Sequence, residues 1–439
     1  MMTQEKSPLR IEGLDEYQAK LMENSPAWLR ELRRRSNLLF AEAGIPTVKD
    51  EEWKYTPLTD VFNRRMHVIL DAAAFVDEDK LASYRDEGDI HIVLVNGIFN
   101  PKLSTVGRLP KGLTILPFNE AAGRFGEEME LTTARLTHND SKTFVSLNHA
   151  LFNDGVFTRV DDNAVIEPLV HIIHITAGDE PDAMVFPRSM VLVGKNAQVS
   201  VMESHLSFGS EGYVSNAMTD IRVAEGAQVQ YCKAESENAA SVHIGTTRVW
   251  QERASTLDFF SFAHGARLTR NNSSILLKGE GTNTIMNGFY ALDGKQHVDN
   301  HTLIDIVYPN CTSSQFYKGL LNGASHAVFN GKIYVHSEAQ KTNGYQLNKH
   351  LLLGPESRVD TKPQLEIFAD DVKCTHGATI GQLSDEEVFY LQSRCINRQT
   401  AIQLLSKGFI DDIINTVKNA SIRRKLGKLL SVKFPEVKL

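Results

Sequence analysis

The sequence predicts a mainly β protein in which a β-solenoid with a parallel sheet is flanked by helical regions at both ends. Two observations support this fold class. The unit Val-x-x-x-Ala-Gln-Val occurs at 193–199 and again at 223–229, thirty residues later. Over 156–381, short β-rich runs alternate with polar turns and show no helical periodicity. Drifting repeats of this kind are typical of stacked coils. An irregular β-sandwich is the alternative.

These patterns divide the chain into three parts. Residues 1–155 are expected to form an N-terminal helical and mixed α/β region, 156–381 the β-helix core, and 382–439 a C-terminal helical region. Because the end coils of a solenoid expose unpaired edges, we expect both helical regions to cap them.

The N-terminal region begins with helix signals. "NSPAWLRELRRRSNLLFAEAGIP" places Ser25 as N-cap and Pro26 at the first helical position, and Gly44 follows the last apolar residue. The basic run at 33–35 is interpreted as a solvated helix face rather than a phosphate site. Further on, "HIVLVNGIF" predicts a strand that ends at an Asn96-Gly97 turn.

After Gly381 the helical pattern returns. Ser384 and a glutamate three residues later form a capping box, and Asn397 can cap a second helix. This second helix carries an apolar stripe that includes Ile402, Leu405, Phe409 and Ile413. Such a stripe can dock into a groove on a partner. The alternative is that the whole stripe packs on the protein's own β core.

Composition excludes several classes of protein. The net charge of −7 argues against a general nucleic-acid binder, and no apolar run is long enough to predict a membrane helix or a signal-peptide core. The four cysteines (Cys232, Cys311, Cys374 and Cys395) are far apart and form no CxxC motif. A disulfide framework is therefore not expected, and the cytoplasm is the predicted location.

Motifs that carry known chemistry are mostly missing. There is no P-loop, no HExxH, no G-x-S-x-G and no Rossmann glycine fingerprint. His171 and His174 are three residues apart, so on a strand they point to opposite faces and cannot chelate one ion by themselves. Both are interpreted as structural.

Cys374 and His376 form a more informative pair in "DDVKCTHG". Residues i and i+2 of a strand face the same way, so a thiolate and an imidazole here can approach one ion. Two ligands do not complete a tetrahedral site, and the others must come from distant residues or another chain. The alternative is a buried cysteine beside a hydrogen-bonded histidine at an ordinary strand end.

Four stretches resemble one known family. They are "TKPQLEIFADDVKCTHGATIGQLSDEEVFYLQSRCI", "FNGKIYVHSEAQKTNGYQLNKHLLL", "EEWKYTPL" and "FVSLNHALFNDGVF". They are similar to the SufB/SufD family, the scaffold subunits of the SUF iron–sulfur cluster assembly machinery. "EEWKYTPL" looks like the SufD type rather than the SufB type.

The resemblance implies a right-handed parallel β-helix and a non-enzymatic subunit that pairs with a SufB-like protein and binds the SufC ATPase. It places His376 at the interface with the SufB-like subunit, near a cysteine of that partner, with Cys374 beside it. The missing ligands would then come from the partner. The SufC-binding surface would lie in the helical region from about Ser384. Cys395 departs from the family, which more usually has glycine there, and is expected to be inert.

The same resemblance sets expectations for cofactors. No cofactor is expected to be held firmly by this chain alone, whereas iron or a nascent iron–sulfur cluster is expected at the interface with the SufB-like partner. Reduced flavin in the complex and a homodimer of the isolated chain are both compatible with the sequence.

Two other functions were weighed against a scaffold. A β-helical enzyme that acts on an extended polymer needs paired carboxylates along a coil, but Asp370 and Asp371 are adjacent and face opposite sides of a strand. An accessory protein of a membrane exporter is disfavoured by the lack of a predicted membrane segment.

Overall fold

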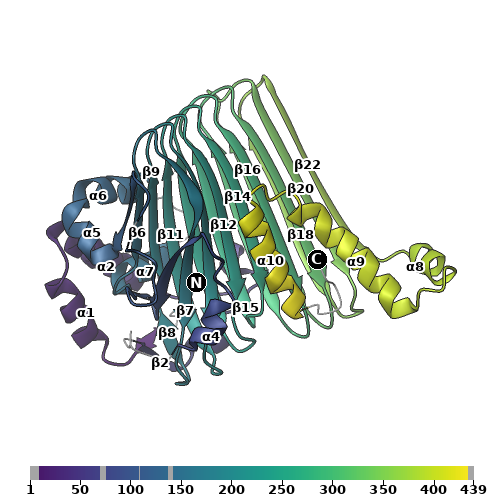
Figure 1. Cartoon of the computed structure of the whole chain (residues 1–439), viewed down its shortest axis with the longest axis horizontal. Helices are drawn as coiled ribbons and strands as arrows, with labels where there is room; N and C mark the ends of the chain where they lie inside the picture. The colour runs from purple at the N-terminus through teal and green to yellow at the C-terminus, as the bar shows by residue number, and fades with distance from the viewer. Residues whose placement is uncertain (1–8, 70–75, 108, 137–141, 434–439) are drawn as a thin grey trace, which may run out of the picture.

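The computed structural model describes residues 9–69, 76–107, 109–136 and 142–433, so the chain ends at 1–8 and 434–439 lie outside the described residues. Two long sheets face each other along the molecule, and successive strands alternate between them (Figure 1). The predicted mainly β solenoid between helical regions is therefore confirmed.

Ten strands form the first sheet, sheet I. In spatial order they are β22 (Val372–Gln382), β20 (Thr342–Leu352), β18 (Thr312–Leu321), β16 (Asn283–Leu292), β14 (Thr256–His264), β12 (Gln228–Ser236), β10 (Gln198–Ser207), β7 (Val165–Thr176), β3 (Ile90–Val95) and β4 (Ile98–Phe99).

Twelve strands form the second sheet, sheet II. Its main path runs through β1 (Arg10–Ile11), β2 (Arg65–Val68), β8 (Ala183–Val185), β11 (Tyr213–Val223), β13 (Val242–Gln251), β15 (Leu268–Leu277), β17 (His297–Ile306), β19 (His326–Val335) and β21 (Arg358–Ile367). Beside this path lie β5 (Leu113–Pro117), β6 (Val156–Val160) and β9 (Arg188–Val193).

The register of the coils follows the repeat seen in the sequence. Val199 pairs with Val229, and Val193 pairs with Val223, in parallel ladders. The coil that contains 193–199 thus precedes the coil that contains 223–229, as predicted. Within the described residues, antiparallel pairing is confined to β3 with β4 and β5 with β6.

Apolar side chains fill the space between the two sheets, which we call the lumen. On sheet II one ladder consists of Ile221, Val249, Ile275, Ile304 and Ile333, each directly above the next. All five are fully buried. Burial of each such side chain contributes roughly 1.5–3 kcal/mol, so the stack of similar residues holds the coils in register.

The N-terminal helices cover the outer face of sheet II at its first coils (Figure 1). They are α1 (Leu14–Glu23), α2 (Ala27–Ala43), α3 (Thr59–Phe62), α5 (Phe118–Arg124), α6 (Gly126–Arg135) and α7 (Lys142–Leu151), with a 3-10 turn at Glu51–Trp53. The short α4 (Glu78–Ala82) lies beside sheet I instead. None of the helices in the described ranges is long and apolar enough to cross a membrane.

One expectation for α2 is wrong, and a second holds only in part. Ser25 does not cap the helix, because its hydroxyl donates to the Leu21 carbonyl and the N-cap position is Pro26. In the basic run at 33–35, Arg34 and Arg35 are exposed as expected, but Arg33 does not lie on a solvated face. It is 1% exposed, and its guanidinium donates to the carbonyls of Ala150 and Phe152 at the end of α7. The arginine donates to carbonyls that have no partner within α7 at its C-terminus. The basic run by itself did not predict this contact.

Other local predictions are confirmed. Asn96 and Gly97 both have positive φ, 52° and 80°, and connect β3 to β4 in a tight hairpin. The Ser384 side chain accepts from the backbone N–H of Glu387 at the start of α8 (Asp385–Gln392), and Asn397 accepts from Thr400 at the start of α9 (Arg398–Ile414).

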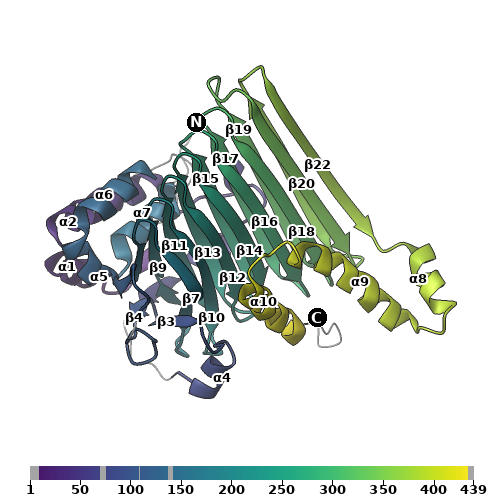
Figure 2. The ribbon, with the colours of Figure 1, turned by 45° about the horizontal axis from the view of Figure 1, so that its top comes forward.

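The C-terminal helices do not cap the last coil, contrary to expectation. After α8, the chain turns back, and α9 and α10 (Ala420–Lys433) lie on the outer face of sheet I (Figure 2). Their apolar side chains, including Ile413 and Leu426, pack on Phe262, Phe289 and Leu320 of that face. The outer face of sheet I is apolar at these strands. The apolar side chains of α9 and α10 are therefore buried against this face and not against the open end of the solenoid. The predicted boundaries at 155/156 and 381/382 stay predictions, although β6 begins at Val156 and β22 ends at Gln382.

Candidate functional site

The final coil of the solenoid is open. β22 pairs only with β20, and β21 only with β19, among the strands described. Each residue of β22 is half-buried or exposed, whereas the equivalent lumen positions one coil earlier are buried. An edge strand of 11 residues with free backbone groups is a template for pairing with another chain.

Cys374 occupies a lumen-facing position on this last strand. It pairs in register with Gly344, and a Cβ built on that glycine would lie 3.2 Å from the Cys374 sulfur. The thiol is half-buried and packs at the edge of the lumen core with Leu365 and Val372. Burial raises the pKa of the Cys374 thiol, so at neutral pH it is protonated until a metal or a base displaces the proton.

His376 is two residues further along the same face and is exposed. Within the described residues no hydrogen bond or ion pair involves its side chain, so both ring nitrogens are available. Directly beneath it, Gln346 of β20 is fully buried in the lumen. The predicted common face of Cys374 and His376 therefore lies at the open end of the solenoid.

The pair supplies only two potential ligands. Among the described residues, the one group of three histidine, cysteine or carboxylate side chains whose ligand atoms all lie within 4.8 Å of one another is elsewhere, in the lumen at β7 and β10. A metal at Cys374 and His376 would need further ligands from a second chain. Asp370 and Asp371 lie exposed in the turn before β22 and form no buried acid/base pair.

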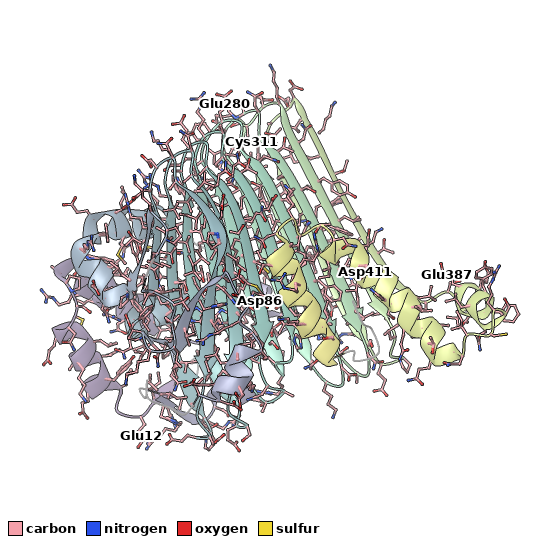
Figure 3. All side chains as sticks on the ribbon, in the orientation of Figure 1. Glu12, Asp86, Glu280, Cys311, Glu387 and Asp411 are labelled. Carbon is pink, nitrogen blue, oxygen red and sulfur yellow. The ribbon has the colours of Figure 1, made fainter. Side chains whose placement is uncertain are left out.

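A second surface lies on the helical hairpin formed by α8 and α9, which projects beyond the last coil (Figure 2). Three apolar side chains on it are exposed: Phe389 (70%) and Tyr390 (56%) on α8, and Leu404 (47%) on α9. The acidic side chains Glu387 and Asp411 mark the two helices in Figure 3. Sequence reasoning missed Phe389 and Tyr390, although an aromatic pair beside acidic residues in a short helix was visible.

The predicted stripe on α9 divides into two halves. Ile402 and Leu405 are half-buried near α8. Ile413 is fully buried against sheet I, and Phe409 packs at the edge of the same cluster. Lys318 of β18 anchors this second half, since its ammonium group donates to the Phe409 carbonyl at 2.8 Å and pairs with Asp412 at 2.6 Å. The surface open to a partner is therefore the first half of α9 together with α8.

The other cysteines lie away from the open end. Cys232 and Cys311 are buried in the solenoid, and the Cys311 sulfur accepts from the Thr282 hydroxyl at 3.1 Å. Cys395 is exposed just after α8. Its φ of 65° lies in the left-handed region, where glycine is favoured.

The comparisons with known proteins identify a class of iron–sulfur cluster assembly proteins. The family model described as "SUF system FeS cluster assembly, SufBD core domain" matches residues 174–409, and the SufBD N-terminal region model matches 10–172. The chain belongs to the SufBD family.

Among its relatives, an iron–sulfur cluster assembly SufBD family protein of Synechocystis sp. is 32% identical over 90% of this chain and 88% of that protein. The iron–sulfur cluster assembly protein SufD of Escherichia coli is 31% identical over 89% of this chain and 90% of its own length. Protein ABCI7, chloroplastic, of Arabidopsis thaliana is 27% identical over 90% of this chain and 84% of its own length. The chain is thus a SufD homologue.

Proposed function

We propose that this protein is a SufD-type scaffold subunit, not an enzyme, that pairs with a SufB-like subunit and binds the SufC ATPase to support iron acquisition and cluster assembly in the cytoplasm. The observation that carries the proposal is the open final coil, on which Cys374 and His376 share one face of an edge strand that is paired on one side only.

Pairing through this end has a clear physical basis. The free edge of β22 can add a strand from another chain, and main-chain hydrogen bonds then satisfy groups that are unpaired here. Apolar side chains at the end, including Ile380 (45% exposed) and Phe368 (59% exposed), gain stability when a partner covers them. A SufB-like subunit with a free strand edge of its own would complete this pairing.

The metal chemistry follows from the same geometry. His376 offers a nitrogen donor and Cys374 a sulfur donor, and the partner would supply the remaining ligands for iron or a nascent cluster. Because the ligand set would be complete only in the complex, the ion would bind only after the two subunits have assembled.

Binding of the ATPase is assigned to the hairpin of α8 and α9. Phe389, Tyr390 and Leu404 are exposed apolar side chains on a projecting element, and Ile402 and Leu405 border them. Such a surface fits a groove on a partner, with the second half of α9 fixed on sheet I as its support.

The pairing proposal is tested with Ile380→Lys in co-purification with the SufB-like subunit. We expect at least tenfold weaker association, about 1.4 kcal/mol, because a charge would be buried at the edge. Tyr308→Lys is the matched control, since Tyr308 is equally exposed (46%) but lies in the turn between β17 and β18. Equal recovery of the partner by both variants would overturn the proposal, as would an isolated chain that dimerises through this end and excludes the partner.

The ATPase proposal is tested with Leu404→Asp. Recovery of SufC in a pull-down should fall while thermal unfolding of the solenoid is unchanged, because Leu404 is 47% exposed and is not part of the cluster packed on sheet I. Leu38→Asp on α2 is the control, a leucine that is 62% exposed on a remote helix. Normal SufC recovery from a folded Leu404→Asp protein would contradict the assignment of the ATPase site to this hairpin. The proposal for the open end would not be affected.

A further inference from the structure

A polar cluster lies inside the solenoid, far from the open end. His174 of β7 and Glu203 and His205 of β10 point into the lumen, and at most 3% of each side chain is exposed. One ligand atom from each of the three lies within 4.8 Å of the other two. β7 and β22 are separated by six strands of sheet I, so the cluster is distinct from Cys374 and His376.

The carboxylate at the centre of the cluster is held from both sides. One oxygen of Glu203 accepts from the Ser189 hydroxyl at 2.6 Å and lies 2.9 Å from the His174 Nε2. The other accepts from the hydroxyls of Thr219 at 2.8 Å and Tyr231 at 2.5 Å. These donors come from both sheets and fix the orientation of the carboxylate, as the hydrogen-bonding partners of metal ligands do.

The two imidazoles are prearranged in the same way. His205 lies opposite His174 in the parallel ladder, and their rings stack 4.7 Å apart with an angle of 7° between the planes. The Nε2 atom of His205 is buried and has no hydrogen-bond partner among the described residues, so it is available to an ion. In His174 the nitrogen that faces Glu203 is Nε2. An orphaned buried polar atom costs about 1–3 kcal/mol, so something that binds a ring nitrogen is expected here.

Charged side chains surround the cluster. The carboxylate of Glu203 belongs to the cluster, and those of Glu235 and Glu237 lie beside it. They face Lys233, which pairs with Glu235 at 2.7 Å, and His243, whose two ring nitrogens lie 3.1 and 2.8 Å from Glu235 and Glu237. Lys233 and His243 thus offset Glu235 and Glu237. The remaining carboxylate, Glu203, faces the two imidazoles and interacts electrostatically with Arg188, which is itself paired with Asp220.

We propose that His174, Glu203 and His205 bind one divalent transition-metal ion, of the Fe²⁺ or Zn²⁺ class, inside the lumen. Two imidazoles and one carboxylate are a ligand set that both ions accept, with further positions left for water. With ligands about 2.0–2.2 Å from the ion, the three donor atoms would draw in to roughly 3–3.5 Å from one another. His174 gives up its contact with Glu203 when the ion takes its place between them.

Burial determines how the ion would be loaded. Because all three side chains are inside the solenoid, the ion must enter during folding or through local opening, and it would then exchange slowly. A chelator that strips surface ions should leave it in place. This inference does not depend on the pairing or ATPase proposals, since it concerns the isolated chain.

The test is the metal content of the purified full-length chain. The protein is produced separately in media supplemented with Fe²⁺ (handled without oxygen), Zn²⁺ or Co²⁺, treated with EDTA and analysed by elemental mass spectrometry. We expect about one retained ion per chain for at least one metal. Glu203→Gln and His205→Gln should each lower this at least fivefold.

Two controls locate the ion. His171→Asn changes a buried histidine of the same strand whose Nε2 contacts the Ser204 hydroxyl at 2.8 Å, on the outer side of sheet I, and should keep the ion. The double variant Cys374→Ser/His376→Ala removes both predicted ligands at the open end and should keep it too.

X-ray absorption of the unaltered metal-loaded protein gives a readout that does not rely on folding of the variants. It should show nitrogen and oxygen neighbours and no sulfur. A retained metal content below a tenth of an ion per chain with all three metals would overturn the proposal. Water, and not a metal ion, would then be the partner of the cluster. Sulfur ligation, or equal retention by folded Glu203→Gln protein, would overturn it as well.

Discussion

His376 on β22 lies directly opposite Gln346 on β20, one coil further into the solenoid. The Gln346 amide nitrogen donates to Gln315 at 2.6 Å, and the amide of Gln315 donates in turn to the Thr302 hydroxyl at 2.6 Å. The carbonyl oxygen of Gln346 is buried and has no partner among the described residues. It is therefore free to accept a hydrogen bond from the imidazole above it and to fix which ring nitrogen faces the proposed partner.

Removal of this acceptor should weaken the site at the open end. We expect Gln346→Leu, which retains most of the side-chain volume, to lower Fe²⁺ affinity of the assembled complex by 10–100-fold, the usual effect of losing a group that orients a ligand. The measurement is a Fe²⁺ titration without oxygen. Gln364→Leu is the control, because Gln364 donates to Asn330 on the neighbouring strand instead.

A second variant tests the same idea without changing the amide. A Cβ on Gly331 would lie 2.4 Å from the Gln346 Nε2 atom, so Gly331→Ala should displace the side chain and lower the affinity in the same direction. Unchanged affinity in both folded variants would show that Gln346 only fills the lumen.

The imidazole itself should be essential. We expect His376→Ala to leave the fold and the complex intact, because the side chain is exposed, and to abolish cluster formation, because alanine supplies no nitrogen donor. Cys374→Ser should do less harm if the thiol is only a packed neighbour and comparable harm if both side chains hold iron. The assay is recovery of iron–sulfur enzyme activity in a strain that lacks its own subunit. Full recovery with His376→Ala would return this strand to a structural role.

The thiol at the open end should respond to pH in a defined direction. Because burial raises the pKa of Cys374 above its ordinary value, the thiolate fraction should grow about tenfold per pH unit from 7 and keep growing above pH 9. Iodoacetamide labelling of Cys374, followed by mass spectrometry, should track that rise in the isolated chain. A labelling rate that levels off below pH 8 would contradict a raised pKa.

Short-range patterns in the sequence predicted much of the fold. The repeat at 193–199 and 223–229 predicted the parallel register, and the caps at Ser384 and Asn397 lie where expected. Such features depend on residues close in the chain or on one repeated spacing. The resemblance to the SufB/SufD family, confirmed by the family comparisons, added the class of function.

Features that depend on distant contacts were not predictable in this way. Arg33 became buried because the end of α7 lies beside it, more than a hundred residues along the chain. The alternation Glu203-x-His205 places two ligands on one face, but only the stacking of β7 on β10 brings in His174. The open end arises because the outer face of sheet I, and not the last coil, attracts α9 and α10.

The last prediction concerns Cys395, which follows α8 with φ of 65°. A side chain in this left-handed conformation costs roughly 1–2 kcal/mol that glycine avoids, and glycine is the usual residue just after a helix. Cys395→Gly should therefore stabilise the hairpin of α8 and α9 by about 0.5–1 kcal/mol, after allowance for the extra freedom of glycine in the unfolded chain. Hydrogen exchange of the amides in α8 measures this directly, since the hairpin can open without the solenoid. Cys395→Ser removes the thiol and keeps the Cβ, so it should leave exchange unchanged. If the serine variant gained as much protection as the glycine variant, the thiol rather than the backbone conformation would be responsible.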